Sequence, residues 1–128
     1  MNKKVLVIDD EETIRKFVKI QLGKEGYEVK EAADGEQAMV LLKKIRFDVL
    51  ICDIMMPNKN GWEVLKEVRL NPETSEIPVI VLTAKNEDDD MFKGYELGAT
   101  YYITKPFTKS QLLLGLNTIF DRKKNSRY

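Results

Sequence analysis

The sequence has no histidine and only one cysteine among its 128 residues. Without histidine, the chain cannot use a histidine-assisted serine or cysteine nucleophile, a histidine-ligated metal or a phosphohistidine of its own. Cys52 alone cannot form an internal disulfide or a thiolate metal cage, which is typical of a protein from a reducing compartment. We therefore expect a cytoplasmic protein.

Excess charge of one sign and long apolar runs are also missing. The 21 Lys and Arg residues are balanced by 21 Asp and Glu residues, so the basic excess typical of nucleic-acid-binding domains is absent. The apolar run at residues 5–8 is too short for the core of a signal peptide. The longest uncharged run, residues 110–120, is well short of the ~18 residues that suggest a membrane span. We expect neither direct nucleic-acid binding nor membrane insertion.

The length fits one domain, because domains usually contain roughly 100 to 200 residues. Hydrophobic residues make up 43% of the chain, which is enough to fill a core. Charged residues make up 33%, above the usual ~25%, which indicates a well-solvated surface. We expect residues 1–128 to form a single domain, with residues 121–128 as a short basic tail.

Short β-branched runs alternate with segments of helical periodicity. The runs lie at residues 4–8, 27–32, 48–53, 78–83 and 101–104. The first two helical segments repeat apolar residues with a period near 3.6, at Ile14, Phe17, Val18 and Leu22 and at Ala38, Leu41, Leu42 and Ile45. The first, third and fourth runs are continuously apolar, as in central parallel strands, whereas the second alternates like an edge strand. The pattern predicts an α/β fold with five βα units in a doubly wound parallel sheet.

Boundary residues support these assignments. Gly23 and Gly26 predict the end of the first helix, and Thr108 followed by Gln111 predicts a capping box at the start of the last. The fourth helix, at residues 87–97, has the weakest apolar pattern, so we expect it to be the mobile element.

Polar side chains follow the ends of the predicted strands. Asp9 and Asp10 follow the first strand, Asp53 ends the third, Thr83 ends the fourth and Lys105 follows the fifth. Ligands of open parallel sheets bind outside the carboxyl ends of the strands. If the first and third strands are neighbours, three carboxylates crowd together there, and their repulsion raises their pKa values unless a cation balances them. A hard divalent cation such as Mg²⁺ or Mn²⁺ fits such oxygen ligands.

Asp53 is the best placed nucleophile of this group. A carboxylate can attack a phosphoryl group and form an aspartyl phosphate. The metal ion, the Lys105 ammonium and the Thr83 hydroxyl could then share the three phosphoryl oxygens. Such a transfer needs no separate general base.

Four motifs in this order resemble the receiver domain of two-component response regulators. They are Asp9-Asp10, Asp53 to Pro57 with Gly61 following, Thr83-Ala84, and Lys105-Pro106-Phe107. The resemblance extends over residues 4–120. It implies a flavodoxin-like (βα)5 fold with strand order 2-1-3-4-5 and helices on both faces, in which the first and third strands are neighbours.

The resemblance also implies a Mg²⁺-dependent reaction at Asp53. This residue would accept a phosphoryl group from the phosphohistidine of a sensor histidine kinase or phosphotransfer protein. Asp10, Asp53 and the backbone carbonyl of Met55 would hold the metal, and Asp9 would act through a water ligand. Thr83 would bind phosphoryl oxygens together with the lysine of the fourth motif.

A conformational switch is implied as well. Thr83 and Lys105 would move towards the phosphoryl group, and Tyr102 is similar to the family's switching aromatic residue. Tyr101 is a rival by one register step. The implied output surface is the fourth helix, fifth strand and fifth helix, where a downstream effector would bind; a phosphorylation-linked homodimer stays open. The resemblance further implies a cis bond between Lys105 and Pro106.

Three other functions remain open from the sequence. One is an interaction-only receiver-like module. An aspartyl-nucleophile phosphohydrolase of the haloacid dehalogenase type would need an aspartate where Met55 stands. An FMN binder would need a Ser/Thr/Gly-rich loop where residues 9–12 are acidic. We expect a signalling switch that catalyses its own phosphorylation and slow dephosphorylation. We do not expect it to act as an enzyme on a metabolite.

Overall fold

The structure is a computed structural model that describes residues 2–56, 60–84 and 98–125. The elements in chain order are β1 (Lys4–Ile8), α1 (Glu12–Lys24), β2 (Glu28–Ala32), α2 (Gly35–Lys44), β3 (Val49–Asp53), α3 (Gly61–Leu70), β4 (Val79–Thr83), β5 (Tyr101–Thr104) and α5 (Lys109–Asn125). The fourth helix expected at residues 87–97 lies outside the described residues.

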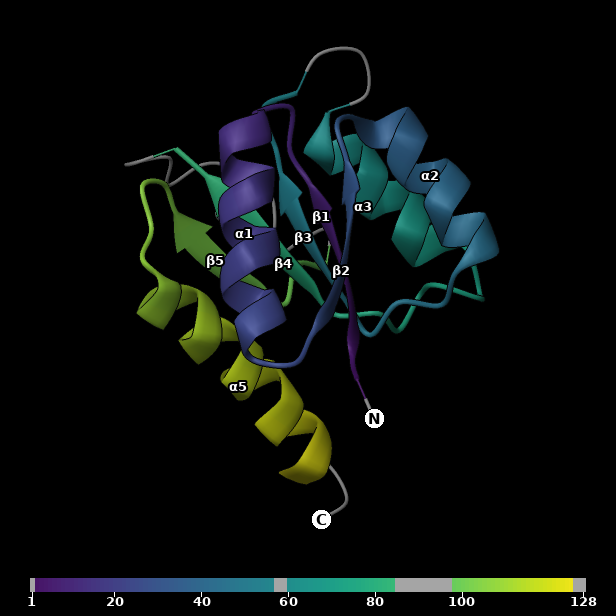
Figure 1. Ribbon diagram of the computed structural model, residues 1–128. Coiled ribbons are helices and arrows are strands. Elements are labelled where there is room, and N and C mark those ends of the chain that lie inside the picture. The colour runs from purple at the N-terminus through teal and green to yellow at the C-terminus, as the bar shows by residue number, and fades with distance from the viewer. Residues whose placement is uncertain (1, 57–59, 85–97, 126–128) are drawn as a thin grey trace.

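The five strands form one parallel sheet in the order β2-β1-β3-β4-β5. This order confirms the flavodoxin-like fold and places β1 beside β3. Figure 1 shows α1 and α5 on one face of the sheet and α2 and α3 on the other. The edge position of β2 confirms the prediction from its alternating pattern, and β1, β3 and β4 lie inside the sheet as predicted.

Successive strand residues bury their side chains on opposite faces of the sheet. Leu6 and Ile8 of β1 join the cluster under α2 and α3, whereas Val5 and Val7 join the cluster under α1 and α5. All residues of β3 and β4 are buried. Fully burying an aliphatic side chain contributes about 1.5–3 kcal/mol. The two clusters therefore hold the central strands, and with them the strand ends, in fixed positions.

One element boundary differs from the sequence-based expectation. Gly26, with a φ of 91°, follows the end of α1, while Gly23 lies within the helix, so only Gly26 acts as the terminating glycine. Residues 121–125, the first part of the expected basic tail, lie within the C-terminal end of α5. Lys and Arg are good helix formers and complement the helix dipole at the C-terminal end, which suits them to this position.

The start of α5 follows the predicted capping box. The backbone N–H of Gln111 donates to Thr108 Oγ1 at 3.2 Å, and the backbone N–H of Thr108 donates to Gln111 Oε1 at 2.8 Å. Among the residues that the structure describes, none of the helices combines the length and apolar character that crossing a membrane requires.

Candidate functional site

The strand register brings the predicted site residues to one edge of the sheet. Ile8 pairs with Cys52, so Asp9 and Asp53 follow side by side. Asp53 pairs with Leu82, which places Thr83 one step further along β4. The backbone N–H of Lys105 donates to the Thr83 carbonyl oxygen at 2.8 Å. The carboxyl ends of β1, β3, β4 and β5 therefore share one site.

Three carboxylates meet at this edge. One carboxylate oxygen from each of Asp9, Asp10 and Asp53 lies within 4.8 Å of the others. Asp9 is fully buried and Asp53 is 4% exposed, whereas Asp10 faces solvent. Like charges so close together, partly removed from water, repel each other and favour either protonation or a bound cation.

Asp9 is fixed on both its backbone and its side chain. Its backbone N–H donates to the Ala32 carbonyl oxygen at 3.1 Å, and its Oδ1 accepts the backbone N–H of Glu11 at 2.9 Å. Its Oδ2 lies 2.8 Å from Lys105 Nζ as an ion pair, yet within the described part of the chain this buried oxygen accepts no well-directed hydrogen bond. Asp9 Oδ2 therefore keeps unused acceptor capacity that faces the site.

Asp53 has fewer compensating contacts. Its Oδ1 accepts the backbone N–H of Met55 at 3.3 Å, and its Oδ2 lies 3.6 Å from Lys105 Nζ. Burial and the nearby Asp9 charge raise the pKa of Asp53 to about 6, and Lys105 offsets this only in part. Burial also raises the pKa of Asp9. A carboxylate of raised pKa stays ionised more readily when a cation binds beside it.

Lys105 is the cation that the described site contains. Its Nζ lies 2.8 Å from Asp9 Oδ2, 3.1 Å from Glu11 Oε1 and 3.6 Å from Asp53 Oδ2. Burial by itself would lower the pKa of Lys105, but the surrounding carboxylates raise it overall, so the ammonium stays charged. The Lys105–Pro106 peptide bond is cis, as expected. Glu11 was not among the predicted site residues, although the acidic run after β1 was a signal for it.

The glycine of the third-strand motif has a packing role. Gly61 begins α3 directly against the backbone after β3, and its N–H donates to the Ile54 carbonyl oxygen at 3.1 Å. A Cβ atom at this position would lie 2.6 Å from the Ile54 Cα, so no larger residue fits. Asn60 and Glu63 form a capping box at the same point. Pro57, in the same motif, lies outside the described residues.

The two tyrosines of β5 lie on opposite faces of the sheet. Tyr102 pairs with Val81, two residues before Thr83, and packs against the cluster under α2 and α3. Tyr101 packs on the other face, where its ring lies 3.1 Å from the Cβ position of Gly115. Because residues two apart in a strand share a face, Tyr102 and not Tyr101 is on the face of Thr83.

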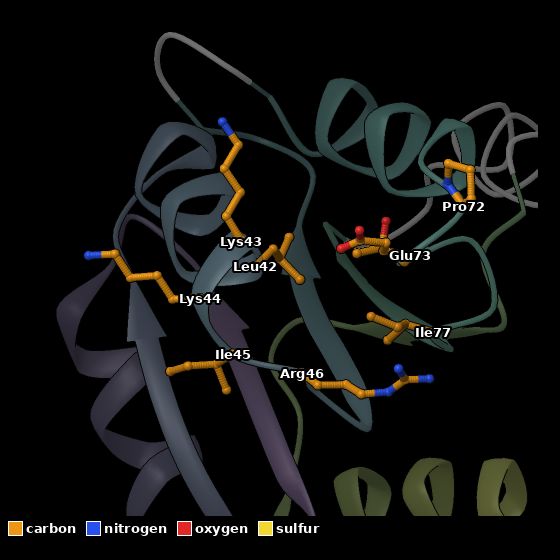
Figure 2. A pocket seen from close by; sticks show the side chains of 9 residues that line it. Leu42, Lys43, Lys44, Ile45, Arg46, Pro72, Glu73 and Ile77 are labelled. Atoms are coloured by element: carbon orange, nitrogen blue, oxygen red, sulfur yellow. The ribbon is translucent and has the colours of Figure 1, made fainter.

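A separate cavity of about 360 Å³ lies at the opposite edge of the sheet. It is lined by the C-terminal end of α2 and by the segment between α3 and β4, both of which precede a strand. Figure 2 shows the charged ends of Lys43, Lys44 and Arg46 pointing in different directions. These cations do not converge on a common point, so the acidic cluster is the better candidate for the functional site.

The donor set of the acidic cluster fits a hard divalent cation. Mg²⁺ prefers oxygen ligands and is bound by one or two carboxylates together with substrate phosphate. The unused oxygen of Asp9, the carboxylates of Asp10 and Asp53, and the raised pKa of Asp53 all favour added positive charge. Fold and site together define a flavodoxin-like α/β domain with an acidic cation site at the carboxyl edge of its sheet.

Comparison with known proteins identifies the family. The response regulator receiver domain family matches residues 5–117, so the chain belongs to this family. Its general function is phosphorylation-based signalling, and its members generally bind Mg²⁺ and interact with histidine kinases and downstream effectors.

Solved structures of this family are similar over nearly the whole chain. The Vibrio cholerae chemotaxis protein CheY4 is 38% identical, with a TM-score of 0.88 and coverage of 92% of this chain and 98% of that one. The receiver domain of the Francisella response regulator 1452 is 34% identical, with a TM-score of 0.86 and coverage of 95% and 99%. The receiver domain of a signal transduction histidine kinase from Syntrophus aciditrophicus is 28% identical, with a TM-score of 0.87 and coverage of 96% and 93%.

Proposed function

We propose that Asp53 accepts a phosphoryl group from the phosphohistidine of a sensor histidine kinase or phosphotransfer protein. A carboxylate oxygen forms the new bond to phosphorus, the bond between phosphorus and the histidine nitrogen breaks, and the electron pair leaves with the imidazole. The observation that carries this proposal is the Asp53 carboxylate itself, which is nearly buried, lies within 4.8 Å of two further carboxylates and is 3.6 Å from Lys105 Nζ.

The acidic residues would hold Mg²⁺, or Mn²⁺ in its place. Asp10, Asp53 and the backbone carbonyl of Met55 are the proposed ligands, with Asp9 acting through a water ligand. When bound, the ion would neutralise negative charge on the carboxylates and the phosphoryl oxygens. The buried, incompletely satisfied Oδ2 of Asp9 supports this assignment.

Lys105 and Thr83 would bind the transferred phosphoryl group. Phosphoryl transfer depends mainly on positioning and charge stabilisation, which a lysine ammonium and a hydroxyl supply. Lys105 Nζ is closer to Asp9 and Glu11 than to Asp53, so binding of phosphoryl oxygens would require it to exchange partners. The Thr83 hydroxyl makes a long contact of 3.4 Å with the Ala84 carbonyl oxygen, which leaves it available for a stronger acceptor.

The phosphoryl group would shift an equilibrium between two conformations of the output surface. Thr83 would move inward and Tyr102, on the same face of the sheet, would rotate into the space behind it. The proposed output surface comprises β5, α5 and the fourth helix, and the last of these lies outside the described residues. It would bind a downstream effector protein or domain, and phosphorylation-linked dimerisation of this surface is a further outcome to measure.

Two properties complete the proposal. The chain would act as a switch that catalyses its own phosphorylation and slow dephosphorylation, without turning over a metabolite. Residues 1–128 would form one receiver domain in the cytoplasm, which is consistent with the single, buried Cys52.

The test is intact mass spectrometry after incubation with Mg²⁺ and a small acyl phosphate. The parent protein and Asp121→Asn, a matched change at an exposed carboxylate on α5, should each gain one phosphoryl group. Asp53→Asn and a chelated parent sample should gain none.

Two results would contradict the proposal. A parent that stays unmodified by both the acyl phosphate and a phosphorylated kinase domain would favour an interaction-only module. Repeated turnover of a small phosphomonoester would instead indicate a phosphohydrolase.

A further inference from the structure

Arg15 connects three elements next to the acidic site. It projects from α1, and its side chain is only 13% exposed. Its Nη1 donates to the backbone carbonyl oxygen of Asp9 at 2.9 Å, and its Nε donates to Glu31 Oε1 on β2 at 3.2 Å. The planar guanidinium can make both bonds at once because its donors form a rigid fork. Arg15 therefore ties the end of β1 to the edge strand.

The carbonyl that Arg15 holds belongs to the peptide between Asp9 and Asp10. On the preceding side, the N–H of Asp9 is already fixed by the Ala32 carbonyl oxygen at 3.1 Å. The hydrogen bond from Arg15 fixes the plane of the peptide between Asp9 and Asp10. The orientation of that plane determines where the Asp10 side chain lies relative to the site. Asp10 faces solvent, so packing around its side chain contributes little to its position.

Glu31 anchors Arg15 through charge. It lies 3.2 Å from Arg15 Nε, 2.9 Å from Lys16 Nζ and 3.6 Å from Lys19 Nζ. Burial by itself would raise the pKa of Glu31, but the hydrogen bonds from Lys16 and Arg15 lower it overall. Glu31 therefore stays ionised at neutral pH and holds the guanidinium beside the Asp9 carbonyl.

We propose that Arg15 is a positioning residue for the cation site: by holding the peptide between Asp9 and Asp10, it keeps the Asp10 carboxylate aimed at the position it shares with Asp53. The proposal rests on the proposed function, because it concerns Mg²⁺ binding at this site. Groups that orient metal ligands typically change metal affinity by about 10- to 100-fold when they are removed.

Electrostatic repulsion alone predicts the opposite change in Mg²⁺ affinity when Arg15 is replaced. Removing a positive charge from the neighbourhood of a cation site strengthens cation binding, because repulsion is lost. Loss of positioning weakens it. The direction of the change in Mg²⁺ affinity therefore separates a positioning role from a merely electrostatic one, and a structural role in α1 predicts lower stability without weaker Mg²⁺ binding.

The test measures the Mg²⁺ dissociation constant by isothermal titration calorimetry and, in separate metal-free samples, the urea midpoint of unfolding. Arg15→Gln should bind Mg²⁺ about tenfold more weakly than the parent. Arg15→Lys keeps the charge but has one ammonium in place of the fork, so it should lose most of the same affinity. Glu31→Gln, which leaves Arg15 in place without its ionic anchor, should lose less.

Lys19→Gln is the matched control, because the exposed Lys19 contacts the same Glu31 carboxylate and forms no other ion pair within the described part of the chain. It should bind Mg²⁺ within twofold of the parent. The proposal is overturned if Arg15→Gln binds Mg²⁺ as tightly as the parent or more tightly, whatever its urea midpoint. A parent that binds no Mg²⁺ overturns the metal assignment of the proposed function and this inference with it, whereas a binding parent with an unaffected variant overturns this inference alone.

Discussion

The two edges of the sheet differ in how their charged side chains are compensated. At the carboxyl edge, the carboxylates of Asp9 and Asp53 lie beside each other, and burial raises the pKa of both. At the opposite edge, the Arg69 guanidinium donates to the carbonyl oxygens of Gly98, Ser75 and Ile77 at 2.7 to 3.1 Å. One edge leaves like charges facing each other, whereas the other satisfies its charge with backbone acceptors.

The difference indicates that the carboxyl edge suits the binding of a cation, whereas the edge around Arg69 contributes to stability. A buried charge without full compensation costs free energy, and a bound cation that supplies the missing partner would offset that cost. Among the described residues of the carboxyl edge, Lys105 is the cation that faces the carboxylates, and it is shared among Asp9, Glu11 and Asp53. At the other edge, Arg69 donates to backbone carbonyl oxygens, and these bonds join α3 to the segments before β4 and β5.

The largest effect is expected at the edge around Arg69. Arg69→Met removes the donors to the three carbonyl oxygens and should lower the free energy of unfolding by about 3 kcal/mol, because partly buried acceptors lose charge-assisted hydrogen bonds. Urea denaturation followed by circular dichroism measures this change. Lys66→Met, an exposed position on the same helix, should change stability by less than ~0.5 kcal/mol. Equal losses in both variants would remove the contrast between the edges.

A change of the opposite sign is expected at the carboxyl edge. In metal-free buffer at pH 7, Asp53→Asn should raise the free energy of unfolding by about 1 to 3 kcal/mol, because it removes one of the mutually repelling charges. Asp48→Asn is the matched change at the other edge, where Asp48 Oδ2 accepts the backbone N–H of Lys4 at 2.7 Å. That variant should lose roughly 0.5 to 1 kcal/mol through a weaker bond. If Asp53→Asn is less stable than the parent, the carboxylates of the carboxyl edge do not destabilise the fold, and the proposed difference between the two edges is wrong.

A comparison of Asp53→Asn with the parent protein also predicts how stability depends on pH. The pKa of Asp53 is about 6 in the folded protein and 3.8 as its ordinary value, so between these pH values the folded state binds more protons than the unfolded state. The contribution of Asp53 to stability therefore falls as pH rises from about 4 to about 6. The stability advantage of Asp53→Asn should be near zero at the acid end and complete at pH 7. Urea midpoints in metal-free buffers across this range should show it, and a difference that shrinks with rising pH would reject the assignment.

The elements and the acidic cluster were predictable because both depend on local pattern. Continuous apolar runs indicated buried strands, and residues that directly follow such strands must meet at one edge of a parallel sheet. Asp9, Asp53 and Lys105 meet there for that reason.

The individual side-chain contacts were not predictable in the same way. Glu11 and Lys105 are 94 residues apart, and their contact depends on the side-chain conformations that the folded site selects. The bond from Arg15 to the Asp9 carbonyl uses a backbone acceptor, which leaves no signature in the spacing of charged residues.

The smallest effect is expected for Glu11→Gln, where two electrostatic contributions oppose each other. Glu11 attracts Lys105, with 3.1 Å between Oε1 and Nζ, but its charge also raises the pKa of Asp9. Its side chain is 58% exposed, and exposed ion pairs contribute about 0 to 1 kcal/mol. The free energy of unfolding in metal-free buffer should therefore change by less than ~0.5 kcal/mol. A loss above about 1 kcal/mol would show that Glu11 is a true partner of Lys105. The negative charges at the carboxyl edge would then be better compensated by Lys105 than the pKa values of Asp9 and Asp53 indicate. The difference in charge compensation between this edge and the edge around Arg69 would be smaller.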